Sequence, residues 1–95
     1  MFIPNAFSPN GDQINDLLFV NAGNDVSKVV TFRIFDRWGD MVFSKKDFLA
    51  NDSAFGWNGT YNGKKLNAGV FVYYVEVELI DGTRRVLNGE VLLVR

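Results

Sequence analysis

The segment from Val70 to Ile80 alternates with a period of two, and this pattern constrains the fold more than any other feature of the chain. Its apolar positions are Phe71, Tyr73, Val75, Val77 and Leu79, and its intervening positions include Tyr74, Glu76 and Glu78. Such alternation is typical of an antiparallel strand with one buried face and one solvated face. Asp81-Gly82 follows and suits a tight turn that needs positive φ angles. The sequence therefore predicts a hairpin in which residues 84–94 form the returning strand.

Gly89 interrupts this returning strand. A glycine inside a strand usually marks a bulge or a close approach of another group to the backbone. The pair Asn88-Gly89 favours the bulge. Near the start of the chain, Phe2-Ile3 is expected to begin an edge strand that Pro4 limits, and Leu17–Val20 is a further short apolar run.

A second hairpin is predicted from residues 28–43. Alternation places Val30, Phe32 and Ile34 on one side of a strand, Arg37-Trp38-Gly39-Asp40 forms the turn, and Met41-Val42-Phe43 begins the return. Further Asn-Gly pairs mark other turns. Six or seven short strands in 95 residues predict an all-β fold, an immunoglobulin-like β-sandwich of about seven antiparallel strands.

Composition limits both the size of the fold and its chemistry. We expect residues 1–95 to form a single domain, whose hydrophobic fraction of 47% and aromatic fraction of 15% supply a core without disulfides, since there is no Cys. The absence of Cys excludes thiol nucleophiles, and the absence of His excludes imidazole bases. A net charge of −1 without a basic stripe argues against nucleic acid as a partner. No apolar run approaches the roughly 20 residues of a membrane span. We therefore expect a non-catalytic module.

Four ordered sequence blocks carry a resemblance to a known family. They are residues 3–16 (IPNAFSPNGDQIND), residues 32–39 (FRIFDRWG) followed by Val42-Phe43, Trp57-Asn58-Gly59 followed by Gly63 and residues 68–73 (AGVFVY), and residues 89–95 (GEVLLVR). Together they resemble the gliding motility-associated C-terminal domain, the type B sorting domain of the type IX secretion system. Two positions depart from the family pattern: Gln13 stands where Gly is common, and Asn58 stands where Asp is common.

The resemblance implies a function in protein export. A domain of this kind follows a large passenger protein and directs it through the periplasm and across the outer membrane, to the cell surface or the medium. Its implied partners are the type IX secretion machinery and a PorP/SprF-like outer-membrane protein, and we expect the domain to be a monomer. The alternatives are a fibronectin-like module for carbohydrate or protein binding in adhesion, and a structural cap on the upstream domain, because β-sandwiches host many functions.

Two segments are candidates for partner recognition. The turn Arg37, Trp38, Gly39 combines a charged and an aromatic side chain at a hairpin tip, where Arg37 either braces neighbouring carbonyls or meets a partner's carboxylate. The last strand is the second candidate, through its edge or its apolar faces, with a buried central strand as the alternative. Its residues are Glu90, Val91, Leu92, Leu93, Val94 and Arg95.

Two weaker candidates concern a metal ion and a modification. Four side-chain oxygen donors surround Gly11, at Asn10, Asp12, Asn15 and Asp16, and such spacing suits a structural calcium ion. The favoured alternative is that these side chains cap their own backbone as Asx turns, with no cofactor bound. Asp52-Ser53-Ala54 resembles the three-residue O-glycosylation site of Bacteroidota, which makes Ser53 a candidate for modification.

Overall fold

The computed structural model describes residues 3–9 and 17–94 of the chain, and these residues contain no α-helix. The strands are β1 (Ala6–Phe7), β2 (Val26–Phe35), β3 (Met41–Phe48), β4 (Thr60–Tyr61), β5 (Lys64–Lys65), β6 (Gly69–Leu79) and β7 (Arg84–Leu93), and a short 3-10 helix, η1, spans Ser53–Phe55. The predicted all-β class with about seven strands is therefore confirmed. Within the same residues, no helix is long and apolar enough to cross a bilayer.

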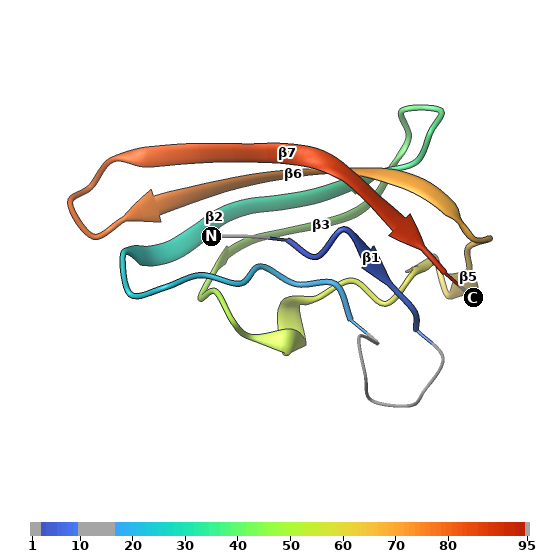
Figure 1. The fold of residues 1–95 in the computed structure, drawn as a ribbon, viewed down its shortest axis with the longest axis horizontal. Helices are drawn as coiled ribbons and strands as arrows, with labels where there is room; N and C mark the ends of the chain where they lie inside the picture. The colour runs from blue at the N-terminus through green and yellow to red at the C-terminus, as the bar shows by residue number, and fades with distance from the viewer. Residues whose placement is uncertain (1–2, 10–16, 95) are drawn as a thin grey trace.

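Five of the strands form one twisted sheet in the order β1-β7-β6-β2-β3, while β4 and β5 form a separate hairpin (Figure 1). The long strands pair in antiparallel fashion, as predicted. One pair departs from this pattern, since β1 runs parallel to β7. Among the described residues, strand pairing at this end begins at Ala6, after Pro4, and Ile3 precedes the strand; Phe2 lies outside the described residues.

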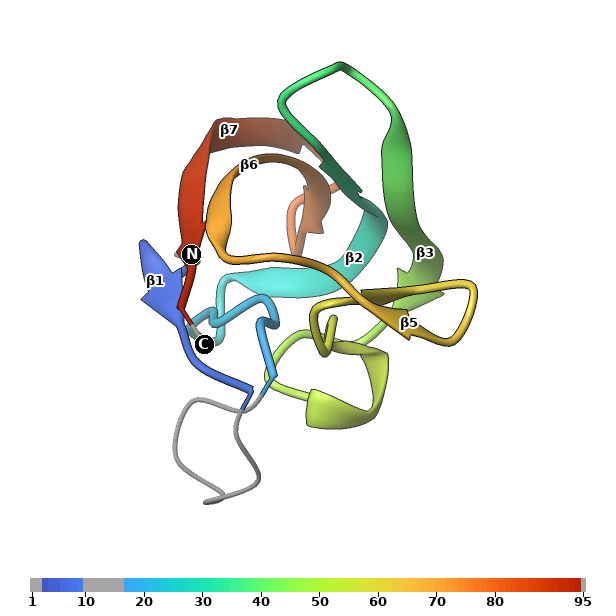
Figure 2. The ribbon, with the colours of Figure 1, turned by 90° about the vertical axis from the view of Figure 1, so that its right-hand side faces the viewer.

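A second layer of largely irregular chain covers one face of this sheet (Figure 2). It contains an antiparallel bridge in which Leu18 and Trp57 exchange two backbone hydrogen bonds of 2.9 and 2.8 Å. The side chain of Asn51 joins the same layer by bonding both backbone groups of Ala22. We call the sheet face toward this layer the inner face and the opposite one the outer face.

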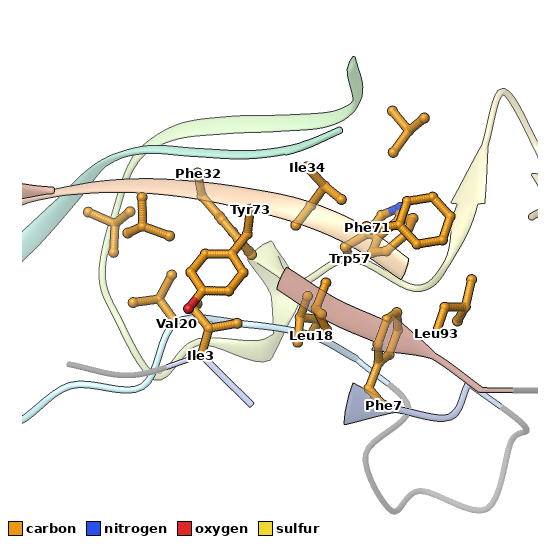
Figure 3. Close-up of a cluster of buried hydrophobic side chains, with 14 of the residues drawn as sticks. Ile3, Phe7, Leu18, Val20, Phe32, Ile34, Trp57, Phe71, Tyr73 and Leu93 are labelled. Carbon is orange, nitrogen blue, oxygen red and sulfur yellow. The ribbon is translucent and has the colours of Figure 1, made fainter. Parts of the chain in front are cut away.

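The core lies between the two layers and is built mainly from aromatic and β-branched side chains (Figure 3). Trp57 is 1% exposed, and its ring centroid lies 5.0 Å from that of Phe71 and 5.4 Å from that of Phe7. Its indole Nε1 donates to the carbonyl oxygen of Thr60, so the polar end of the ring is satisfied. Trp57 therefore closes the core, as a Trp beside a turn commonly does.

The two predicted hairpins are confirmed, with two differences of detail. A register shift between Val29 and Thr31 makes Val30 the extra residue of a bulge, so Val29 is fully buried while Val30 is half-buried. No bulge occurs at Gly89, because the β6–β7 register is continuous. The close-approach alternative is the correct one there: a Cβ on Gly89 would meet the hydroxyl oxygen of Tyr73 at 2.8 Å.

Candidate functional site

The β2–β3 turn is held rigidly by Asp36. Its Oδ1 accepts hydrogen bonds from the backbone nitrogens of Trp38 and Asp40, both at 2.9 Å. The backbone of Asp36 adds two more bonds, to Asp40 and Gly39. Gly39 has a φ of 87°, which a side chain would strain. The sequence Asp-Arg-Trp-Gly-Asp thus encodes a fixed loop that carries two large side chains at its tip.

Those two side chains point into solvent. Trp38 is 76% exposed, the largest exposed fraction among the large hydrophobic residues described. The guanidinium carbon of Arg37 lies 5.0 Å from the centroid of the Trp38 ring, which is cation–π distance. An exposed tryptophan braced by an arginine is typical of a recognition surface rather than of a core.

The last strand is a central strand whose two faces differ. Val91 and Leu93 are buried on the inner face, whereas Glu90, Leu92 and Val94 are exposed. Its backbone is paired on both sides, with β6 along its length and with β1 at its end. Recognition of this strand through a free edge is therefore excluded at residues 92–93, and its outer face remains available. Arg95 lies outside the described residues.

A patch of apolar side chains covers one end of the outer face. It spans β3, β6 and the end of β7, and its members, each 41–47% exposed, are Met41, Val70, Val72, Leu92 and Val94. They form a continuous surface because Val70 lies opposite Leu92, and half-buried Phe35 lies between Val72 and Met41. We call these five residues the outer-face patch. Exposed apolar groups that gather in this way mark interaction sites.

The other end of the outer face is mainly charged, with Val86 as an exposed apolar side chain among the charges. There Arg84 Nη1 lies 3.0 Å from Glu76 Oε2, and Lys28 is paired in register with Glu78. The two ends of one sheet face therefore differ in character, and the apolar end is the one beside the β2–β3 turn.

An open hollow of about 160 Å³ separates this turn from the chain entering β6. Asp36, Arg37 and Trp38 form one wall, and residues 66–71 form the other. Val70 belongs both to the hollow and to the outer-face patch. The structure thus brings the two recognition candidates, residues 37–39 and the last strand, to one end of the sheet.

The edges of the sheet are poorly suited to strand addition. β3 carries exposed Lys45 and Lys46 on its edge, and Asp47 has a positive φ of 57°. Charged side chains and backbone kinks of this kind discourage edge pairing. β1, at the opposite edge, has two residues. At these two edges the exposed-edge hypothesis has less support than the outer face, whereas β7 itself is paired with β1 at residues 92–93 alone among the described residues.

The weaker candidates remain predictions. Asn10, Asp12, Asn15 and Asp16 lie outside the described residues, so the calcium hypothesis and its Asx-turn alternative stay open. Ser53 opens η1, where Asp52 Oδ1 accepts a hydrogen bond from the backbone nitrogen of Ala54.

Met41, Val70 and Val72 are patch residues that the sequence analysis did not single out. The sequence does contain a signal for Val70 and Val72. Both are apolar, although they occupy positions of the alternating segment that are expected to face water. Met41 could be assigned to the patch only once the pairing of β2 with β3 was known.

Comparison with protein families gives a match over nearly the whole chain. The model of the CHU_C type IX secretion signal domain matches residues 1–92. A comparison with curated proteins gives no match. The matched range contains the β2–β3 turn, the hollow and most of the outer-face patch.

Proposed function

Because the chain belongs to the CHU_C family of type IX secretion signal domains, we propose that it directs a large passenger, joined ahead of residue 1, across the outer membrane. The family match over residues 1–92 is the observation that carries this proposal. A type IX secretion signal implies export to the cell surface or into the medium. The passenger supplies any activity, and the domain itself is non-catalytic in this proposal.

The partner we propose is a PorP/SprF-like outer-membrane protein of the secretion machinery. The outer-face patch supports docking by a protein, since it gathers exposed apolar side chains beside the exposed Trp38. Aromatic and arginine side chains are enriched among residues that dominate binding energy, and Arg37 and Trp38 are such a pair. The domain acts as a monomer in this scheme.

The test is a fusion of residues 1–95 to the C-terminus of a fluorescent protein that carries a signal peptide. It is expressed in a host with a working type IX system and in a strain that lacks the machinery. We expect fluorescence outside the cell in the first strain and retention in the second. Periplasmic retention of the folded fusion in both strains would contradict the proposal, provided that the host exports its own type B proteins.

Outward-facing substitutions locate the signal without unfolding the domain. Removing residues 90–95 would delete buried Val91 and Leu93 and so confuse recognition with folding. The double variant Leu92→Ser, Val94→Ser alters the outer face alone and is expected to reduce export. Val86→Ser, an apolar-to-serine change at an exposed position of the same strand outside the outer-face patch, is the matched control.

The exposure of Trp38 also favours a second candidate, an adhesion module that stacks this ring on a sugar. A glycan array probed with the domain and with its Trp38→Ala variant tests it. Saturable glycan binding that depends on Trp38, together with a fusion that is not exported, would support adhesion instead of sorting.

A further inference from the structure

Arg37 has no ion-pair partner among the described residues and offers a cation at the rim of the hollow. Within residues 3–9 and 17–94, the ion pairs are Lys28 with Asp47 and Arg84 with Glu76, and neither involves Arg37. Its guanidinium lies over the Trp38 ring, and no hydrogen bond joins it to another residue in the described part of the chain. A planar guanidinium of this kind binds a carboxylate through two parallel hydrogen bonds.

The one carboxylate that lines the hollow does not neutralise Arg37. Asp36 directs Oδ1 to two backbone nitrogens of its own turn, so its charge is partly compensated there. Asp36 and Arg37 are the two formally charged residues that line the hollow. The hollow therefore combines the Arg37 cation with one carboxylate that is already hydrogen-bonded within its own turn, and its other lining residues are uncharged.

The opposite wall of the hollow is suited to an apolar side chain. Leu66, Val70 and Phe71 contribute to it, with Val70 leading onto the outer-face patch. A ligand that places a carboxylate over Arg37 can therefore lay a neighbouring apolar side chain against Val70. The rigidity of the turn means that little ordering is required on binding.

We propose that this hollow is a docking site for an extended segment of the export machinery in which a carboxylate lies next to a large apolar side chain. The carboxylate pairs with Arg37 and stacks beside Trp38, and the apolar side chain lies against Leu66 and Val70. Charge complementarity with an unpaired arginine selects an acidic partner over a neutral or basic one. The attribution to the machinery rests on the proposed function, whereas the carboxylate chemistry does not.

The chemistry is tested on the purified domain by two-dimensional NMR. Two blocked peptides serve as probes, acetyl-Leu-Asp-Leu amide and acetyl-Leu-Asn-Leu amide, which are nearly equal in shape and differ in whether the central side chain is a carboxylate or a neutral amide. We expect the acidic peptide to shift the indole N–H signal of Trp38 and the side-chain signals of Arg37, with an affinity about tenfold higher than that of the Asn peptide. The buried indole of Trp57, bonded to Thr60, reports that the fold is intact.

Equal shifts from both peptides, or none at Trp38, would overturn the proposal. A shift of the Trp38 signal with protein concentration alone would also overturn it, since the surface would then bind a second copy of the chain. Because this experiment needs no export, it remains decisive even if the sorting function fails.

The source of the segment is tested by export of the fluorescent fusion. Arg37→Gln removes the cation and is expected to lower export about tenfold. Arg37→Lys keeps the charge without the planar guanidinium group and is expected to give an intermediate level of export. Arg33→Gln is the matched control, because Arg33 is an exposed arginine on the same hairpin that does not line the hollow. We expect this control to export as the parent does.

These outcomes separate the two proposals. Normal export of Arg37→Gln beside normal export of the parent fusion would overturn the docking site and leave the sorting function standing. Loss of export in Arg33→Gln and Arg37→Gln alike would also overturn it, since a general charge effect would then explain the result.

Discussion

At the residue scale, the contact between Gly89 and Tyr73 shows how closely the inner face is packed. A Cβ at position 89 would lie 2.8 Å from the Tyr73 hydroxyl oxygen and 3.0 Å from its Cζ. We therefore predict that Gly89→Ala lowers the free energy of unfolding by about 1–3 kcal/mol, since overpacking forces the ring to move. Urea unfolding followed by tryptophan fluorescence measures this change.

The double variant Gly89→Ala, Tyr73→Phe is the control for that mechanism. It removes the nearest atom and should recover part of the loss, so the two changes should not be additive. Unchanged stability of Gly89→Ala would mean that the ring is not fixed against the backbone.

Asp81 gives the β6–β7 turn a dependence on pH. Its Oδ1 accepts hydrogen bonds from the Thr83 hydroxyl at 2.6 Å and from the Thr83 backbone nitrogen at 3.0 Å. These bonds, the hydroxyl bond first, hold the pKa of Asp81 below its ordinary value of 3.8. Because the folded chain favours the ionised carboxyl, this stabilisation is present above about pH 3.8 and is lost as the pH falls through the lower folded pKa.

We predict that Asp81→Asn flattens this acid-side dependence. The amide oxygen of Asn can accept the same two bonds but does not titrate, so the variant should unfold less steeply with acid in the window below pH 3.8. Urea unfolding at a series of pH values provides the comparison. Parallel curves for the parent and the variant would show that the turn does not couple to protonation of Asp81.

At the scale of the element, β7 separates folding from recognition on its two faces. Leu93 is fully buried, and its neighbour Leu92 belongs to the outer-face patch. We predict that Leu93→Ala costs about 2–5 kcal/mol of the free energy of unfolding, because it leaves a cavity. Leu92→Ala should cost less than about 1 kcal/mol, since that side chain is partly solvated already.

Urea unfolding of this matched pair, with fusion export measured in parallel, checks the prediction. Leu92→Ala should reduce export although the domain remains stable. Similar stability losses in the two variants would contradict the division of β7 into a core face and a recognition face.

Hairpins were predictable because their signals are local. Asp81-Gly82 and the segment Arg37–Asp40 each fix a turn between two alternating segments, and both turns form as predicted. The bulge at Val30 was not predictable from alternation, because it depends on how β2 fits β6. For the same reason, the sequence identified residues 37–39 and the last strand separately, and only the strand order places them at one end of the sheet.

At the scale of the whole molecule, the fold joins its two ends. β1 pairs in parallel with the end of β7, where Leu92 donates its backbone N–H to the Asn5 carbonyl and Val94 donates to that of Phe7. No local pattern predicts a contact between segments so distant in sequence. Pairing of this kind closes a long loop and therefore forms at an entropic cost that the core must offset. Recognition at the end of β7 thus depends on residues at the start of the domain.

Phe7 is a buried β1 side chain that anchors this closure to the core. It is 2% exposed, and its ring centroid lies 5.4 Å from that of Trp57. We predict that Phe7→Ala lowers the free energy of unfolding by about 3–5 kcal/mol, a large share of the stability of so small a domain. Export of the fusion should fall as the stability falls, although Phe7 lies outside the outer-face patch.

Tyr61→Ala is the control for this prediction. It truncates an exposed aromatic ring on the β4–β5 hairpin and should change the free energy of unfolding by no more than about 0.5 kcal/mol. Urea unfolding and export measured on both variants decide the matter: full export of a destabilised Phe7→Ala fusion would mean that the machinery recognises the segment near β7 without the closed fold.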